Sequence, residues 1–158
     1  MDYQFLITKF YTAFQNRDWQ TMNRCYHPQA TFSDPAFRQL TGKEVQAMWH
    51  MLCLNARDFT LTFSEVQVNK DSGNCHWQAS YSFSKTGRKV HNKINAYFTF
   101  KEGQIYHHQD SFDLWRWSRM ALGLPGVLLG WTPFLQNKIH ATARHSLTKF
   151  INEHPEYQ

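Results

Sequence analysis

The sequence predicts a single domain of the α+β class, and three observations support that prediction. Apolar residues recur at helical spacing over the first third of the chain, alternate with polar residues from Phe59 to Asp113, and return to helical spacing beyond it. The 158 residues are enough to enclose one core. Aromatic residues make up 16% of the chain, an excess that favours an internal space lined with rings.

Three helices and a short strand are expected before the alternating region. Residues 2 to 15 form an amphipathic helix, with apolar side chains at Tyr3, Leu6, Ile7, Phe10, Tyr11 and Phe14. Asp18 can cap a second helix, which must end before Pro28. A short strand follows over 30–33, and residues 41–44 have the spacing of a capping box that starts the third helix.

The alternating region predicts a four-stranded antiparallel meander with one buried face. Its strands are expected over 59–68, 77–83, 90–98 and 104–113. Turn-forming residues separate the strands at 71–74, 85–88 and 101–103.

The C-terminal region predicts a helical extension over residues 116–158, added to a core that spans residues 3–115. An apolar loop over 123–130 should precede a helix capped by Thr132, with Pro133 at its first position. The apolar run from Ala121 to Trp131 is too short and too interrupted to span a membrane. We expect it to cover the mouth of a pocket, with a dimer contact or a membrane-touching loop as alternatives.

Composition narrows the class of partner. The net charge of +5 comes from basic residues that are scattered along the chain, with one group around residues 85–93. The aromatic residues recur with the periodicity of core residues. No nucleic acid is therefore expected as a partner. Three widely spaced cysteines (Cys25, Cys53, Cys75) argue against a disulfide framework and a structural zinc site. Together with the lack of a recognisable signal peptide, they predict a cytoplasmic protein.

The densest ionisable chemistry lies on the last expected strand. There His108, Asp110 and Phe112 share one face, while His107 points to the other. A histidine and an aspartate beside a ring on a half-buried strand are typical of the polar floor of a pocket. A buried pair that only satisfies itself is the structural alternative, and a metal site formed by His108, Asp110 and Asp34 is a weaker one.

The order of elements, together with the stretch Tyr26 to Pro35 (Tyr-His-Pro-Gln-Ala-Thr-Phe-Ser-Asp-Pro), resembles the nuclear transport factor 2-like superfamily. Within it the chain is most similar to the SnoaL-like and ketosteroid-isomerase-like bacterial members. Residues 42–44 resemble the start of that superfamily's third helix, and 103–105 the opening of its last strand.

The resemblance implies a cone-shaped curved antiparallel sheet that wraps the N-terminal helices around a deep apolar pocket. It also implies frequent homodimers formed through the outer face of the sheet. Asp34 matches the catalytic base of the isomerase members, Tyr26 a supporting tyrosine, and Asp110 an acid/base of the cyclase-like members. Two departures from the family pattern argue against steroid isomerisation, because Phe10 and Ala96 occupy the positions of the two oxyanion donors.

These features predict a pocket protein that acts on or binds a small apolar molecule without a cofactor or a metal. Its candidate catalytic residues are Asp34, His108 and Asp110. The first hypothesis is an isomerase, cyclase or hydratase, and the alternative is a non-catalytic binding or dimeric accessory protein. The side chains expected to line the ligand pocket are Tyr11, Tyr26, Trp49, Trp77, Tyr81, Phe98, Phe112 and Trp115.

Overall fold

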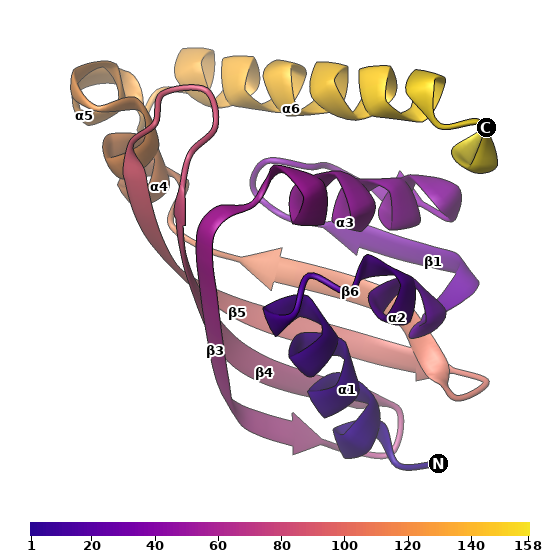
Figure 1. The fold of residues 1–158 in the computed structure, drawn as a ribbon. Coiled ribbons are helices and arrows are strands. Elements are labelled where there is room, and N and C mark those ends of the chain that lie inside the picture. The colour runs from indigo at the N-terminus through magenta and orange to yellow at the C-terminus, as the bar shows by residue number, and fades with distance from the viewer.

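A computed structural model describes all residues from 1 to 158 and has at its centre one curved, six-stranded sheet (Figure 1). The strands lie in the order β2-β1-β6-β5-β4-β3. Every neighbouring pair is antiparallel except β1 and β6, which run parallel. The bounds are β1 Tyr26–Ser33, β2 Leu40–Thr41, β3 Arg57–Val68, β4 Ser72–Ser82, β5 Lys89–Lys101 and β6 Gln104–Ser111.

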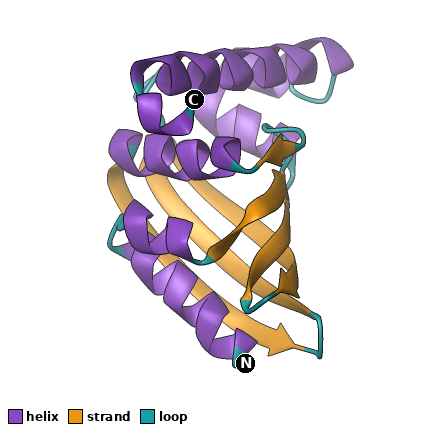
Figure 2. Cartoon of the chain, turned by 90° about the vertical axis from the view of Figure 1, so that its right-hand side faces the viewer, coloured by secondary structure: helices purple, strands orange, loops and turns teal.

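The α+β prediction and its four-stranded meander are therefore confirmed, with β3 to β6 as the meander. The N-terminal helices lie in the hollow of the sheet, as both views show (Figures 1 and 2). These are α1 Tyr3–Gln15, α2 Trp19–Arg24 and α3 Lys43–Asn55. The sheet bends around them without closing, which is the cone shape that the resemblance implied.

The C-terminal extension consists of α4 Leu114–Leu122, α5 Leu124–Leu129, α6 Pro133–Glu153 and the short 3-10 helix η1 Pro155–Tyr157. α6 runs across the outside of α3, so that α3 lies between it and the sheet (Figure 1). No helix combines the length and the apolar character needed to span a membrane.

Side-chain caps set the starts of most helices. Asp18 accepts a hydrogen bond from the backbone N–H of Thr21, and Thr132 does the same for Leu135, as the sequence predicted. At α3 the N-cap is Gly42 and makes no side-chain bond, but Glu44 reaches back to the backbone N–H of Thr41. Only the acidic half of the expected capping box is formed there.

Three boundaries differ from the sequence prediction. β1 begins at Tyr26 instead of residue 30, because Pro28 is compatible with an extended strand. β4 begins at Ser72, inside the expected turn, since the chain reverses within residues 69–71. The expected apolar loop is wrong over Leu124–Leu129, which form α5 with Pro125 in the first turn, where its missing N–H does no harm.

The core fills the space between the sheet and α1 to α3. Strand β5 shows how the sequence directs side chains into this core. Its side chains alternate strictly between exposed and buried from Lys89 to Phe98. All three cysteines are buried with free thiols, and burial raises the pKa of Cys53 and of Cys75 to about 12.

Strand β3 forms one edge of the sheet and is interrupted twice. Its pairing with β4 shifts between Arg57 and Thr60 and again between Ser64 and Gln67. Asp58 and Glu65 lie within these shifts with positive φ angles of 51° and 56°. Both irregularities are β-bulges that carry an exposed acidic side chain.

Candidate functional site

The parallel pair β1 and β6 brings the two predicted carboxyl groups together. Phe32 is paired with His108, and Ser33 with Gln109. Asp110 follows His108 on the buried face of β6, and Asp34 is the first residue after β1, where it is half-buried. The end of this strand pair therefore brings Asp34 close enough to Asp110 for the two groups to interact electrostatically.

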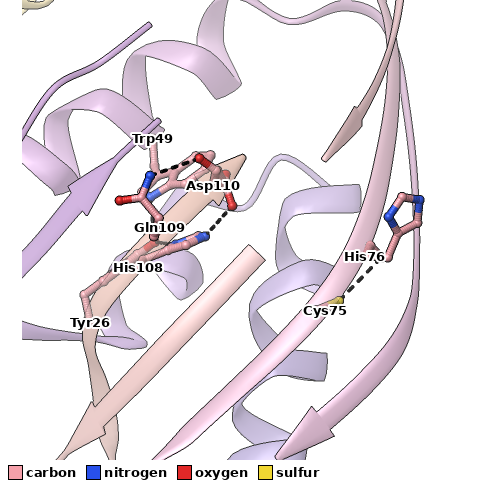
Figure 3. A network of polar contacts seen from close by, with 7 residues as sticks. All are labelled: Tyr26, Trp49, Cys75, His76, His108, Gln109 and Asp110. Atoms are coloured by element: carbon pink, nitrogen blue, oxygen red, sulfur yellow. Dashed lines mark hydrogen bonds and ion pairs between the residues drawn. The ribbon is translucent and has the colours of Figure 1, made fainter. Parts of the chain in front are cut away.

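His108 and Asp110 are each only 2% exposed, and they belong to a buried chain of hydrogen bonds (Figure 3). The indole N–H of Trp49 donates to the hydroxyl oxygen of Tyr26 over 2.9 Å. That hydroxyl lies 2.6 Å from Nδ1 of His108, and Nε2 of His108 lies 2.8 Å from Oδ1 of Asp110.

One assignment of protons satisfies every group in this chain. Tyr26 accepts from Trp49 and donates its own proton to Nδ1 of His108. His108 is then a neutral imidazole that carries its proton on Nε2 and donates it to the Asp110 carboxylate. Burial, followed by the negative charge of Asp110, raises the pKa of Tyr26 well above its usual value, so its phenol stays protonated.

Asp34 combines a structural role with an unusual acidity. Its Oδ1 accepts the backbone N–H groups of Ala36 at 2.7 Å and Phe37 at 2.5 Å, which is the turn that an Asp before Pro favours. Burial of the carboxyl group, with a smaller contribution from the charge of Asp110, nevertheless raises its pKa to about 7, although the two amide N–H groups lower it. Asp34 can thus hold or release a proton near neutral pH.

Near this series of hydrogen bonds, two buried donors have no hydrogen-bond partner: the hydroxyl of Tyr11 and Nε1 of Trp77. Their rings lie 5.8 Å apart, and the Tyr11 ring is 6.3 Å from Phe98. Burial and then the Asp110 charge raise the pKa of Tyr11 well above its usual value. Buried donors without partners are rare, so this pair is the part of the interior best suited to receive an acceptor from a ligand.

The remaining predicted ring residues fall into three places. Trp49 and Phe98 are fully buried against His108, with ring centroids 6.0 and 4.3 Å away. Tyr81 and Phe112 are half-buried at the rim of the core. Trp115 lies apart on α4, where its indole N–H donates to the carbonyl of Val127.

Sequence reasoning missed three rings that take part in the site. Phe10 and Phe32 pack edge-on against His108, with centroids 5.8 and 5.0 Å away. Trp117 donates its indole N–H to the Tyr81 hydroxyl over 2.8 Å. The alternation of β1 contains the signal for Phe32, since it lies two residues before Asp34, whereas the position of Trp117 depends on how α4 packs.

Neither ring nitrogen of His108 is free for a metal, because Tyr26 and Asp110 engage both. A second group of potential ligands, His50, His154 and Glu156, has its donor atoms within 4.8 Å of one another beneath the C-terminus. There Nδ1 of His50 also pairs with the Tyr157 hydroxyl.

The deep pocket expected between Asp34 and Asp110 stays a prediction. A cavity of about 120 Å³ lies on the other side of the Asp34 turn, toward α6. Its walls are Ala36, Phe37, Arg38, Leu40, His140 and Arg144.

The model of the SnoaL-like domain family matches residues 7–108, which include α1 to α3 and most of the sheet. No curated protein matches the chain. The match ends within β6, so the C-terminal helices lie outside it.

Solved structures share the fold at low sequence identity. A hypothetical protein of Catenulispora acidiphila with a ketosteroid isomerase-like fold, in complex with trimethylamine, is 15% identical with a TM-score of 0.66, over 81% of this chain and 97% of that one. An epoxide hydrolase of M. tuberculosis, similar to the LEH type, is 16% identical with a TM-score of 0.61, over 78% and 92%. A putative polyketide cyclase of Xanthomonas campestris is 15% identical with a TM-score of 0.61, over 73% and 93%.

Proposed function

Because the chain belongs to the SnoaL-like domain family, we propose that it is an acid–base enzyme acting on a small, mostly apolar molecule. The reaction is an isomerisation, cyclisation or hydration in which Asp34 transfers the proton. Hydrolase and cyclase names among proteins of the same fold support this class, although the likeness itself extends only to the fold.

The observation that carries the proposal is the buried carboxyl group of Asp34, which is close enough to Asp110 to feel its charge. Two neighbouring carboxyl groups in a shielded setting cannot both ionise easily, so one of them keeps its proton to a higher pH. Asp34 is that group, with a pKa of about 7. A general base or acid works best when its pKa is close to the ambient pH.

Asp110 and His108 act as positioning residues in this scheme. His108 holds Asp110 by a 2.8 Å bond, and Tyr26 and Trp49 hold His108 from the other side. Burial accounts for most of the raised pKa of Asp34, and the negative charge of Asp110 adds to it. We assign no proton transfer to His108, because both of its nitrogens are already engaged.

Tyr11 and Trp77 would bind the substrate oxygen. The resemblance left the chain without oxyanion donors at Phe10 and Ala96, whereas the Tyr11 hydroxyl and Trp77 Nε1 are two buried donors that lack acceptors. A carbonyl or epoxide oxygen between them would gain the hydrogen bonds that stabilise developing negative charge.

The test measures proton abstraction directly. The protein is incubated in D2O with a panel of small apolar ketones and epoxides, and deuterium incorporation and product formation are followed by NMR. We expect Asp34→Asn to abolish both and Asp110→Asn to reduce them, with melting temperatures unchanged or higher. Full activity of both variants on an identified substrate would show that these roles are wrong.

Non-catalytic binding on the same scaffold is the second candidate. The two amide bonds to Asp34 favour it, because they already give this carboxylate a structural function. Native mass spectrometry of the purified protein would identify a retained molecule. Binding that Tyr11→Phe weakens, without turnover of the bound molecule, would support this candidate over the enzyme.

The homodimer implied by the resemblance is also a proposal. It would use the outer face of the sheet, where Tyr97 is half exposed beside polar side chains of β4 and β6. Analytical ultracentrifugation of the wild type and of Tyr97→Asp tests it, because a charge at the centre of a dimer contact should produce monomers.

A further inference from the structure

We propose that the end of the molecule formed by α5 and its flanks docks on an anionic membrane surface. The apolar tip is defined by seven exposed side chains: Trp115, Leu124, Val127, Leu128, Leu129, Trp131 and Phe134. They come from α4, α5, the turn that follows α5 and the start of α6, which lie together at one end of the molecule (Figure 1). Contiguous apolar patches of this kind mark contact with a partner or a membrane.

The packing of α5 turns its large side chains outward. Its contact with α4 is made by glycines, since a Cβ on Gly126 would overlap the carbonyl of Ser118 and one on Gly130 would overlap the Ser118 hydroxyl. On the α4 side, the fully buried Ser118 is the residue that both glycines meet most closely. The small residues therefore face inward, and the leucines face solvent.

The backbone carbonyl groups at the end of α5 all have hydrogen-bond partners within the protein, so they do not need water. A helix leaves its last carbonyl groups without partners, yet here each of them accepts a bond. Val127 and Leu128 receive the indole N–H groups of Trp115 and Trp131, at 3.3 and 3.1 Å. The next two carbonyls, of Leu129 and Gly130, accept from the backbone and side chain of Thr132 and from the side chain of Gln136.

These bonds matter because an unsatisfied backbone group in a lipid environment costs several kcal/mol, on the order of a lost buried hydrogen bond. At the other end of α5, Pro125 has no N–H to satisfy, and the N–H of Val127 bonds to Gly123. Both tryptophans are anchored by their polar edge and expose the ring, as is common at membrane interfaces.

Charge identifies the kind of surface. Residues 114–152 contain no Asp or Glu but five Lys or Arg: Arg116, Arg119, Lys138, Arg144 and Lys149. Of these, Arg144 is paired with Glu44 of α3, so the other four supply the positive charge. The β4–β5 turn adds Arg88, whose side chain donates to the carbonyl of Met120 in α4. Asp113, which caps the start of α4, adds one negative charge beside these cations. Exposed leucines flanked by cations fit anionic lipid headgroups.

The same charge distribution disfavours a second copy of the chain as the occupant. A two-fold contact through the apolar tip would bring two cationic surrounds together, with too few acidic side chains nearby to balance them. An anionic bilayer neutralises these cations and buries the leucines at once.

Vesicle flotation of the full-length protein tests the proposal, with mixed phosphatidylcholine and phosphatidylglycerol vesicles compared with pure phosphatidylcholine. We expect binding to the mixed vesicles that added salt weakens. Leu128→Ser and Phe134→Ser should each weaken binding about ten-fold, the effect of removing one buried apolar side chain. Lys138→Gln should weaken binding to mixed vesicles about five-fold and leave pure phosphatidylcholine unaffected.

Matched controls lie elsewhere on the same protein. Leu54, at the end of α3, is 59% exposed like Leu128, and Phe5, on α1, is 65% exposed against 71% for Phe134. Leu54→Ser and Phe5→Ser should bind as the wild type does. The proposal is overturned if the wild type does not float with mixed vesicles, or if the control and tip variants lose binding equally. It is also overturned if the tip variants only convert a dimer into monomers while vesicle binding persists.

Discussion

The hydroxyl of Tyr26 lies 2.6 Å from Nδ1 of His108, and together with the bond from Trp49 this contact connects α3 to β6 through the middle of the core. Tyr26 accepts from Trp49 of α3 and donates to His108 of β6. Because all of these groups are buried, neither Trp49 nor His108 could bond to water instead if the Tyr26 hydroxyl were removed.

We therefore expect Tyr26→Phe to be strongly destabilising. The change leaves both the Trp49 indole N–H and Nδ1 of His108 without a partner, at about 1–3 kcal/mol for each buried group. The free energy of unfolding, measured by urea denaturation, should fall by about 2–4 kcal/mol. Tyr97→Phe on the exposed face is the control and should change it by less than about 0.5 kcal/mol.

The same substitution at Tyr11 should have the opposite effect. Its hydroxyl is buried without a partner, so Tyr11→Phe removes an unsatisfied donor and leaves the ring packing in place. We expect the free energy of unfolding to stay the same or to rise by about 1 kcal/mol. A loss comparable to that of Tyr26→Phe would mean that the Tyr11 hydroxyl has a partner in solution.

The stability of the protein should depend on Asp34 in a defined direction of pH. Its pKa is raised to about 7 in the folded chain from 3.8, so ionisation opposes folding. Below about pH 4 the Asp34 carboxyl group is neutral in both the folded and the unfolded state. Between about pH 4 and 7 the free-energy cost of ionising it in the folded state grows, and above about pH 7 that cost reaches its full value.

Asp34→Asn should consequently stabilise the protein above pH 7, and the gain should disappear as the pH falls toward 4. We expect about 1–2 kcal/mol above pH 7, less than the full shift would yield because Asp34 is partly exposed and solvent screens its charge. Thermal melts of both proteins across this range provide the measurement. A gain independent of pH would assign the effect to a cause other than ionisation.

The proposed role of Asp34 as the base also predicts the pH dependence of activity. The base must be ionised, so kcat/KM should rise as the pH increases through about 7 and then level off. Asp110→Asn removes the charge that helps to raise the pKa of Asp34, so the midpoint of the rise should move to lower pH. A midpoint unchanged in Asp110→Asn would contradict the coupling between the two aspartates.

Gly126→Ala tests the contact that orients α5. The added Cβ meets the Ser118 backbone, which cannot move as a flexible side chain would. We expect a loss of about 1–3 kcal/mol, typical of overpacking, despite the better helix propensity of alanine. Hydrogen exchange should show faster opening of α4 and α5, whereas Val127→Ala on the exposed side should change little.

Much of the arrangement around the site could be predicted from the sequence because strands alternate with a fixed period. That period placed His108 and Asp110 on the buried side of β6 and His107 outside, and the structure confirms both by burial. The resemblance brought Asp34 into consideration. Its closeness to Asp110 depends on the parallel pairing of β1 and β6, two strands more than seventy residues apart in the chain, which local patterns do not specify.

The C-terminal helices were harder to predict for a physical reason. Residues 123–130 contain three glycines and a proline, which usually indicate a loop. In the structure Gly126 and Gly130 are required by close packing against Ser118, so they mark a tight helix contact. Only the partner surface distinguishes these two uses of glycine.

The bulges at Asp58 and Glu65 have a consequence for the molecule in concentrated solution. An edge strand as long as β3 would otherwise offer a straight row of free backbone groups to a neighbouring molecule. Two kinks, each with a protruding carboxylate, break that row into short pieces that cannot align with another strand. The two bulges thereby oppose edge-to-edge association of molecules through β3.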